Sequence, residues 1–519
     1  MDEDDINRFH KALKSGRRPY QAVPLHHRLT ETEIARIAVN EYRLPGVEVN
    51  AQLVRSYPFP FLFTHTVGYV GKINDREWNR FSEEEQERYK GLPTIGKIGL
   101  EKYYENELFG TTGFQHVEIN ARMRVLRTLE WQPPVPGTDL HLHLDKRLQE
   151  TAFQAMDGRR GAVVAIDVAT GGILAMLSTP TYDTNLFVTG ISHKNYNALT
   201  GSIDLPLFDR VIQGTYPPAS TIKPALGLAG LASKSITTQH RIFDPGYYKL
   251  ENDDRLYRDW KRTGHGWVNI HKAIVQSSDT FFYDMAFRTG IDNIHHYGTM
   301  FGLGSYTGID IPNERPGLWP SREWKKATRN LPWFPGDTLN VGIGQGDASA
   351  TPLQLAVMTA TLASKGKRLK PRLVKSMDDS VIEPEVASQM VNINSQHWDA
   401  IHAAMYDVIH ASNGTGRRIG RNIEYKMAGK TGTAQVVGIK QGEKYDSEAL
   451  LERHRDHALF VGFAPYKNPK IAIAVLVENG EAGSKAAAPV ARKLFDAHLL
   501  GNYLLDEQER VIATNGVQP

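Results

Sequence analysis

Two pairs of apolar segments, one before and one after a long helical stretch, constrain the fold of this chain most. The first pair is Gly161–Asp167 and Ile173–Leu177, with a Gly-rich turn between them; the second is Ala458–Phe463 and Ile471–Val477, joined by residues 465–469. Each pair has the strand length and turn chemistry of a β-hairpin. We therefore expect an α+β domain in which one antiparallel sheet is closed by strands from both ends of the segment, with helices on both faces.

The N-terminal quarter has a different pattern and predicts a separate, mixed α/β domain. Thr30 with Glu33 forms a capping box, which marks a helix start. The proline-rich stretch at residues 132–137 is the clearest linker in the chain. The sequence thus predicts an N-terminal domain at residues 1–136, a second domain at residues 137–505 and a C-terminal tail at residues 506–519.

Composition excludes several classes of protein. The 519 residues include 61 basic and 58 acidic side chains, a near-balance that does not fit nucleic-acid binding. Cysteine is absent, which excludes a disulfide scaffold, a thiol nucleophile and a Cys-ligated metal. No apolar run is long enough to span a bilayer, and Met1–Asp5 lacks the features of a signal peptide. We expect a soluble chain, either cytosolic or separated from a membrane anchor.

Ser220 is the first candidate for a catalytic residue. It stands in the stretch Tyr216–Pro224, where two prolines precede it and small residues follow, so a helix should begin at or near it. Lys223 lies three residues on, on the same face of such a helix, where a neutral amine can take the proton of the serine hydroxyl. The same S-x-x-K spacing recurs at Ser364–Lys367, which follows a predicted helix and reads as a solvated helix end.

Two further motifs give Ser220 and Lys223 a context. Lys430–Thr433 (KTGT) begins a predicted strand, whose edge can pair with an extended peptide, while Gly432 permits close approach of another backbone. Ser277 and Asp279 offer a hydroxyl and a carboxylate that can relay a proton, although both residue types also favour helix caps. The three motifs occur in the order that is typical of serine enzymes acylated by penicillin.

On these motifs the chain resembles the class B penicillin-binding proteins, and within them the elongation-specific branch, whose second motif also ends in Asp. Further similar segments are Trp333–Asp337, Gly344–Gly346 and Thr351–Gln354. The resemblance implies a transpeptidase domain from about Gly137 onward, and an N-terminal pedestal that serves docking or dimerisation.

The resemblance also implies a mechanism. Ser220, with Lys223 as base, would attack the D-Ala–D-Ala bond of a donor stem peptide and pass the acyl group to a neighbouring stem amine; β-lactams would acylate the same serine. Ser277, Asp279 and Lys430 would complete the catalytic set. The backbone N–H groups of Ser220 and Thr433 would form the oxyanion hole, and the residues expected to hold the donor carboxylate are Lys430, Thr431 and Thr433, with Gly432 between them.

Partners, location and cofactors follow from the same resemblance. It implies peptidoglycan stem peptides and β-lactams as ligands, elongation-machinery membrane proteins including a glycan-polymerising one as partners, and the periplasmic face of the bacterial inner membrane as location. Acyl transfer requires no cofactor. Some relatives bind a structural zinc ion, for which Asp244, Asp259 and His265 match three ligands, while Ser278 stands where the fourth, a cysteine, is expected.

The motifs leave two alternatives open. A serine β-lactamase or D,D-carboxypeptidase uses the same residues but transfers the acyl group to water; the length of the chain argues against a β-lactamase. A β-lactam-binding sensor or scaffold would use Ser220 as a signalling site and the N-terminal domain as a docking module.

Overall fold

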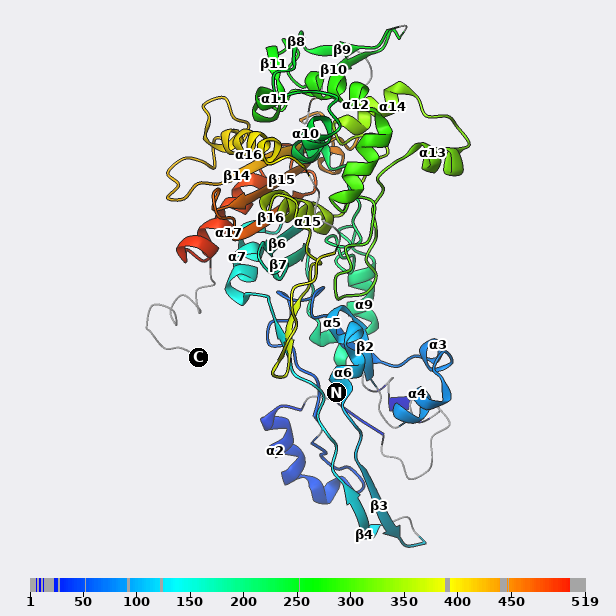
Figure 1. Ribbon diagram of the computed structural model, residues 1–519. Coiled ribbons are helices and arrows are strands. Elements are labelled where there is room, and N and C mark those ends of the chain that lie inside the picture. The colour runs from blue at the N-terminus through cyan, green and yellow to red at the C-terminus, as the bar shows by residue number, and fades with distance from the viewer. Residues whose placement is uncertain are drawn as a thin grey trace. The chain divides into compact units, whose positions relative to one another are not determined.

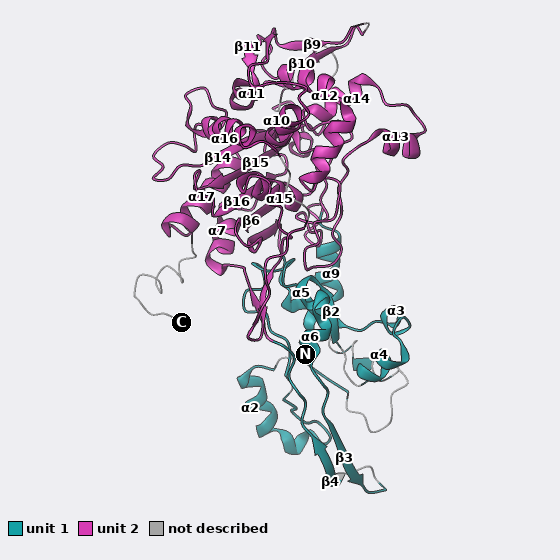
Figure 2. Cartoon of the chain, in the orientation of Figure 1, with its two compact units in different colours: residues 1–138, 182–202 teal, residues 139–181, 203–519 magenta. Residues whose placement is uncertain are grey.

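The computed structural model describes residues 23–26, 29–51, 53–90, 94–121, 125–251, 253–387, 393–438, 446 and 448–504, with isolated residues near the N-terminus. The chain divides into two compact units (Figures 1 and 2). Unit 1 comprises residues 1–138 and 182–202; unit 2 comprises residues 139–181 and 203–519. The predicted boundary at residue 136 lies close to this division, but Tyr182–Ser202, which the sequence prediction places in the second domain, groups with unit 1. The predicted tail at residues 506–519 lies outside the described residues.

The described residues of unit 1 form short helices and two separate two-stranded sheets, β1–β2 and β3–β4. The capping box of Thr30 and Glu33 is present at its first described helix. Its helices are α2 (Glu31–Val39), α3 (Asp75–Trp78), α4 (Glu83–Arg88), α5 (Gly99–Tyr103), α6 (Glu105–Phe109), α8 (Asn185–Val188) and α9 (His193–Thr200), with a 3₁₀ turn at Glu41–Arg43; its strands are β1 (Tyr69–Lys72), β2 (Thr94–Ile98), β3 (Phe114–Ile119) and β4 (Val125–Gln132).

Unit 2 contains a five-stranded antiparallel sheet and the helices that cover it. Its helices are α7 (Lys146–Met156), α10 (Lys223–Ala232), α11 (Ile270–Gln276), α12 (Asp279–Met300), α13 (Arg322–Arg329), α14 (Pro335–Gly342), α15 (Pro352–Ala363), α16 (Ser395–His410) and α17 (Ala487–Leu500), with 3₁₀ turns at Ala219–Ile222 and Glu452–His454. Its strands are β5 (Leu140–Leu142), β6 (Gly161–Asp167), β7 (Ile173–Thr179), β8 (Arg241–Asp244), β9 (Tyr247–Lys249), β10 (Leu256–Arg258), β11 (Gly266–Asn269), β12 (Val374–Met377), β13 (Ser380–Val381), β14 (Ala428–Ala434), β15 (His457–Ala464) and β16 (Ile471–Val477).

The five-stranded sheet has the order β14-β15-β16-β6-β7. The late hairpin β15–β16 joins the early hairpin β6–β7 through antiparallel pairing of β16 with β6, as predicted. Every residue of β16 is buried, and β6 and β15 are buried along almost their whole length. Because successive side chains of a strand point to opposite faces, full burial requires cover on both. The α+β architecture is thus confirmed, and β14 forms one edge of the sheet.

Helix α10 forms the centre of the helical part of unit 2. Its sequence, KPALGLAGLA, is apolar on all sides, as a helix surrounded by other helices must be. It packs against α12 and α16. Gly227 permits this approach, because a Cβ there would lie 3.0 Å from Ile401 Cδ1. Among the described residues, no helix combines the length and hydropathy that a membrane span requires.

Candidate active site

Ser220 lies in a 3₁₀ turn, Ala219–Ile222, that leads directly into α10. The prediction of a helix beginning near Ser220 holds, with a local difference. Pro224 has no N–H to donate to the Ser220 carbonyl, and the Lys223 N–H donates to it instead, which gives the tighter 3₁₀ geometry. The Ala219 N–H donates to the Gly344 carbonyl at 2.8 Å, which ties the turn to the predicted Gly344–Gly346 segment. The Ser220 side chain is partly exposed.

Lys223 is fully buried and its amine points toward the second motif. Nζ donates to the Ser277 carbonyl at 3.0 Å and to Ser277 Oγ at 3.4 Å, and forms an ion pair with Asp279 Oδ1 at 2.6 Å. It also lies 5.1 Å from the ring centroid of Phe282. The sequence prediction placed this amine against the Ser220 hydroxyl; within the described part of the chain its hydrogen bonds go to Ser277 and Asp279 instead.

Ser277 occupies the junction between α11 and α12. Its left-handed backbone (φ 59°) ends α11, and Ser278 caps α12 by accepting from the Phe281 N–H. The expectation of a helix cap therefore describes Ser278, whereas Ser277 turns its hydroxyl toward the two lysines. Asp279, the first residue of α12, reaches Lys223 from the same junction. The sharp turn at Ser277 is what lets both side chains face the same amine.

Lys430 approaches Ser277 from the edge strand β14. Its Nζ is buried and donates to Ser277 Oγ and to the Thr431 carbonyl, each at 2.9 Å. Burial, with a further contribution from the charge of Lys223, lowers the pKa of Lys430 well below its usual value. The Ser277 hydroxyl thus lies between two lysine amines, and the three predicted motifs meet at this one oxygen.

Among the described strands, only β15 pairs with β14, and the Ser220 turn lies against this edge strand. Gly432 permits the contact, because a Cβ there would lie 2.8 Å from Thr221 Cγ2. Thr433 is exposed, and its carbonyl accepts from Gln345 Nε2 at 3.4 Å on the side away from β15. Since the N–H and C=O of one residue in an antiparallel strand point the same way, the Thr433 N–H also faces this open edge.

Two polar neighbours of this edge were given no role by the sequence. Thr415, in the loop after α16, accepts a hydrogen bond from Thr431 Oγ at 2.9 Å. Gln345 stands in the Gly344–Gly346 segment, which resembles a family segment but for which the sequence predicts no role. Tertiary folding brings both to the strand, and only the two glycines beside Gln345 marked its loop as unusual.

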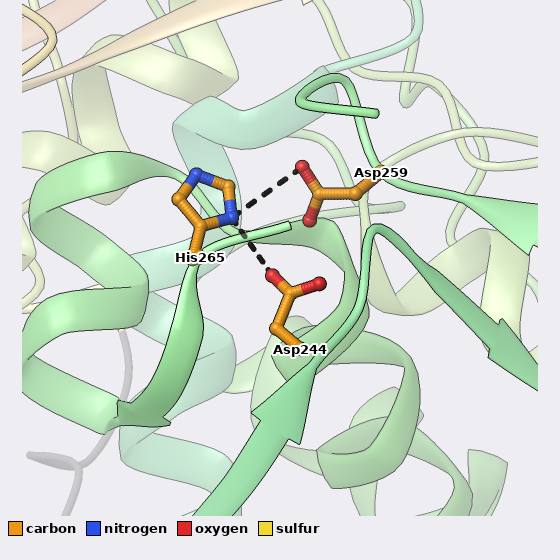
Figure 3. A group of neighbouring side chains, drawn as sticks. All are labelled: Asp244, Asp259 and His265. Atoms are coloured by element: carbon orange, nitrogen blue, oxygen red, sulfur yellow. Dashed lines mark hydrogen bonds and ion pairs between the residues drawn. The ribbon is translucent and has the colours of Figure 1, made fainter. Parts of the chain in front are cut away.

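Asp244, Asp259 and His265 form the buried cluster shown in Figure 3, where both carboxylates face Nδ1 of the imidazole. His265 Nδ1 lies 2.7 Å from Asp244 Oδ2 and 3.7 Å from Asp259 Oδ1. Ser278 Oγ donates to Asp244 Oδ2 at 2.8 Å, so all four predicted positions come together. Burial opposes ionisation of Asp244, but the hydrogen bonds of His265, Gly246 and Ser278 prevail and lower its pKa to about 2.

The cluster is joined directly to the second motif. Asp259 Oδ2 accepts from the backbone N–H groups of Asp279 at 2.7 Å and Thr280 at 3.0 Å, at the start of α12. A carboxylate at a helix N-terminus satisfies N–H groups that have no partner within the helix. Burial, followed by the charge of Asp279, raises the pKa of Asp259. The sequence marked these residues as metal ligands and did not reveal this capping contact.

Comparison with family models covers both units. Residues 161–496 match the model of the penicillin-binding protein transpeptidase domain, and residues 1–142 match that of the penicillin-binding protein dimerisation domain. The peptidoglycan D,D-transpeptidase MrdA of Haemophilus influenzae is 44% identical over 504 residues, which are 96% of this chain and 77% of that protein. MrdA of Escherichia coli K12 is 43% identical over 507 residues, or 97% and 80% of the two chains.

Solved structures agree. Penicillin-binding protein 2 of Pseudomonas aeruginosa, in complex with WCK 5153, is 48% identical, with a TM-score of 0.77 over 89% of this chain and 92% of that one. Penicillin-binding protein 2 of Helicobacter pylori, in complex with MreC, is 31% identical, with a TM-score of 0.82 over 96% and 88%. This chain therefore belongs to the penicillin-binding protein family and carries both its dimerisation domain and its transpeptidase domain.

Proposed function

We propose that this chain is a peptidoglycan D,D-transpeptidase in which Ser220 is the nucleophile. The observation that carries the assignment is the meeting of the three motifs at Ser277 Oγ, which accepts from Lys430 and from Lys223, the residue that directly follows the Ser220 turn. This constellation suits acyl transfer, because it combines a partly exposed hydroxyl with buried amines and an open strand edge.

Lys223 is the base in this proposal. Its amine must be neutral when it takes the Ser220 proton, and the Asp279 carboxylate at 2.6 Å is placed to accept the proton that the ammonium gives up. A small rotation of the lysine side chain would then move Nζ from Ser277 toward Ser220. Lys430 acts through Ser277: it donates to the Ser277 hydroxyl and so orients that hydroxyl for proton transfer to the leaving group.

The edge of β14 binds the donor. The Thr433 N–H faces the open edge and, with the Ser220 N–H at the start of the helical segment, forms the oxyanion hole. Thr431 and Thr433 hold the terminal carboxylate of the donor. Lys430 is completely buried, so it acts on the donor carboxylate through its charge and not through a direct hydrogen bond.

The reaction is a balanced exchange of acyl bonds. Ser220 Oγ forms an ester with the penultimate D-Ala carbonyl while the bond to the terminal D-Ala nitrogen breaks, and the leaving amine takes the proton relayed from Ser220. The amine of a second stem peptide then attacks the ester, and Ser220 regains its proton. A β-lactam ring follows the first half of this path, and its opened product remains attached to the serine.

Mass spectrometry after incubation with penicillin tests the nucleophile. We expect one added drug mass on the peptide that contains Ser220. Ser220→Ala should abolish the adduct, whereas Ser364→Ala, at the other S-x-x-K sequence, should label like the parent. In the parent, Ser364 Oγ donates to the Thr361 and Lys367 carbonyls as part of a helix end. A penicillin adduct on Ser364, or no adduct anywhere on the parent protein, would contradict the assignment.

We propose that unit 1 docks this enzyme to membrane proteins of the cell-elongation machinery, on the periplasmic side of the inner membrane. The H. pylori relative has been solved with MreC. Strand β4 carries the exposed apolar side chains Leu126, Leu129 and Trp131 within an isolated two-stranded ribbon, which is a poor arrangement for a chain without a partner. Replacing Leu129 and Trp131 by Ser should weaken co-purification with an MreC-type partner and leave penicillin labelling intact; unchanged co-purification would exclude this surface.

We also propose that Asp244, Asp259 and His265 are the residues that would hold a structural zinc ion. Their donor atoms lie within 4.8 Å of one another, and the 2.7 and 3.7 Å separations around His265 Nδ1 bracket the ~3.3 Å that bonds of about 2 Å require in a tetrahedron. Ser278 offers a hydroxyl, a weaker ligand than thiolate. Such an ion would fasten β8, the loop after β10 and the start of α12 to one another.

Elemental analysis after dialysis against zinc, and again after chelation, tests this site. We expect bound zinc that is retained more tightly by Ser278→Cys and is lost in Asp259→Ala. The melting temperature should rise with zinc in the parent and more in the Cys variant. Equal and negligible zinc in the parent and in Ser278→Cys would show that the cluster is held by hydrogen bonds alone.

A further inference from the structure

Strands β8 and β11 form a two-stranded sheet with an aromatic outer face. Phe243 and Trp267 lie opposite each other in the register, and their rings are edge to face with centroids 5.8 Å apart. Both are largely exposed, at 58% and 65%. Alternation along the strands puts Arg241 beside Phe243 and Asn269 beside Trp267 on this face, whereas Asp244 and Val268 point to the buried side.

The outer face is positively charged at its border. Arg241 is exposed, and Lys272 lies alongside β11 with Nζ donating to the carbonyls of His265 at 2.6 Å and Trp267 at 3.0 Å. Both strands are fully described, and their single carboxylate, Asp244, belongs to the opposite, buried side. Two aromatic rings and the Arg241 guanidinium therefore face solvent together. Lys272 and Asn269, whose Oδ1 accepts from the Lys272 N–H as the cap of α11, are partly exposed at the border of this face.

This face is too small for a stable protein interface. Four residues on each of two strands cover on the order of 13 Å by 10 Å, several-fold below the ~800 Å² that each partner contributes to a standard protein complex. Its size suits a narrow chain. Pyranose rings present flat faces of C–H bonds that stack on aromatic rings, whose faces carry negative charge, and the amide and guanidinium supply hydrogen bonds to hydroxyl and acetamido groups.

The surface is also connected to the candidate active site. The β8–β11 sheet contributes Asp244 and leads, through Asn269, into α11, whose last turn precedes Ser277. Trp260, itself exposed, donates its indole N–H to the Gln276 carbonyl and lies edge to face with His265, with ring centroids 5.7 Å apart. A polymer bound on β8–β11 would thus lie near the residues that process its stem peptides.

We propose that the Phe243–Trp267 face binds the glycan strand of peptidoglycan, with Arg241 and Lys272 pairing with carboxylates of its stem peptides. The identity of this polymer rests on the proposed transpeptidase function. Binding here would raise the local concentration of substrate near Ser220 and keep the enzyme on one strand between reactions.

Affinity measurements on the whole chain test this surface with two probes: chitotetraose, which offers sugar rings alone, and soluble uncrosslinked glycan strands that carry stem peptides. We expect the parent to bind both. The double variant Phe243→Ser/Trp267→Ser should lose at least about tenfold in affinity for both probes. Arg241→Glu should weaken binding of the peptide-bearing strands and leave chitotetraose binding unchanged.

Tyr306→Ser, which removes an equally exposed aromatic ring elsewhere in unit 2, is the matched control and should bind both probes like the parent. Penicillin labelling of Ser220 is recorded for every variant, so that failure of the proposed nucleophile is distinguished from failure of the glycan surface. If the double variant is not labelled by penicillin, which would indicate misfolding, the single variant Trp267→Ser is measured instead. Parent-like binding by a labelled aromatic variant, or no binding by the parent, overturns the proposal.

Discussion

Ser277 is the residue on which the site depends most at the atomic scale. Its hydroxyl is shared by Lys430 at 2.9 Å and Lys223 at 3.4 Å, while its carbonyl accepts from Lys223 as well. Burial of its amine lowers the pKa of Lys430, and the charge of Lys223, which shares the same oxygen, lowers it further. The position of each amine is therefore set by an oxygen on a left-handed residue between two helices.

Removing the Ser277 hydroxyl should impair acylation without unfolding the chain. In Ser277→Ala the backbone carbonyl still holds Lys223, but Lys430 loses a partner and the proton path to the leaving group is interrupted. We expect the rate of penicillin acylation to fall by about 10–100-fold, equivalent to about 1.4–2.7 kcal/mol in the barrier. Stopped-flow acylation measures the effect, with the melting temperature as a check on folding. A parent-like rate would remove Ser277 from the proton path.

Gly432 tests how closely the edge strand must approach the nucleophile turn. An added Cβ would lie 2.8 Å from Thr221 Cγ2, so Gly432→Ala must push β14 away from the Ser220 turn, at a cost of about 1–3 kcal/mol. We expect penicillin acylation to slow by about tenfold or more. The control is Gly438→Ala, where a Cβ meets nothing within 4 Å.

A second-site change distinguishes this steric explanation from a general loss of stability. Thr221→Ser deletes the methyl group that the new Cβ meets and retains the hydroxyl that donates to the Pro218 carbonyl at 2.5 Å. The Gly432→Ala/Thr221→Ser double variant should regain most of the lost rate. If it does not, the contact with Thr221 is not the cause.

At the scale of elements, features encoded in a local residue pattern could be predicted from the sequence, and features that depend on contacts between distant segments could not. The strands β6, β15 and β16 are buried on both faces, so they appear in the sequence as unbroken apolar runs, and the sheet could be predicted from them. The hydrogen-bond partner of Lys223, Ser277, could not be predicted in this way. The contact depends on the left-handed conformation of Ser277, which a non-Gly residue seldom adopts and which no neighbouring residue signals. The capping of α12 by Asp259 is likewise a contact between distant segments.

Asp456, the residue before β15, makes the stability of the fold depend on pH. It is 5% exposed, and its Oδ1 accepts from the Val436 N–H beyond the end of β14. Burial, with a smaller effect of the Glu481 carboxylate, raises its pKa to about 6. Ionisation is therefore unfavourable in the folded state, and this contribution lowers stability as the pH rises from about 4 to about 6.

Asp456→Asn should remove this dependence, because the amide stays neutral and its oxygen can still accept from Val436. Relative to the parent, we expect the variant to gain about 2 kcal/mol in the free energy of unfolding between pH 4.5 and pH 8. Urea unfolding at the two pH values gives the comparison. If the free energies of unfolding of variant and parent differ by the same amount at pH 4.5 and pH 8, ionisation of Asp456 does not destabilise the folded state.

At the scale of the whole molecule, the division into two units does not follow the order of the chain. Tyr182–Ser202 interrupts unit 2 after β7 and belongs to unit 1. It packs there through side chains: Phe187 stacks on Tyr69 with centroids 4.1 Å apart, and the Tyr182 carbonyl accepts from Thr64 Oγ at 3.0 Å. A boundary drawn from linker composition cannot detect such an excursion, because its evidence is a set of contacts with residues more than a hundred positions earlier.

Asn185 is the polar anchor of this excursion, and it supplies the test of how unit 1 is held together. Its Oδ1 accepts from the Tyr57 N–H and its Nδ2 donates to the Tyr57 carbonyl, both at 3.0 Å, so its amide pairs with the backbone as a neighbouring strand would. Asn185→Ala leaves both backbone groups without these partners, and we expect unit 1 to lose about 1–3 kcal/mol of stability.

Hydrogen–deuterium exchange measures this loss where it occurs. Protection should fall in residues 57–70 and 182–188 of Asn185→Ala, while Asn197→Ala, an exposed change on α9, should leave it unaltered. Penicillin labelling of Ser220 should proceed as in the parent, because the Ser220 turn, α10 and the five-stranded sheet all belong to unit 2. Unchanged protection would mean that the aromatic contacts of Tyr182 and Phe187 alone hold the excursion in unit 1. A loss of labelling would mean instead that the transpeptidase fold requires an intact unit 1, and that the two units fold as one cooperative structure.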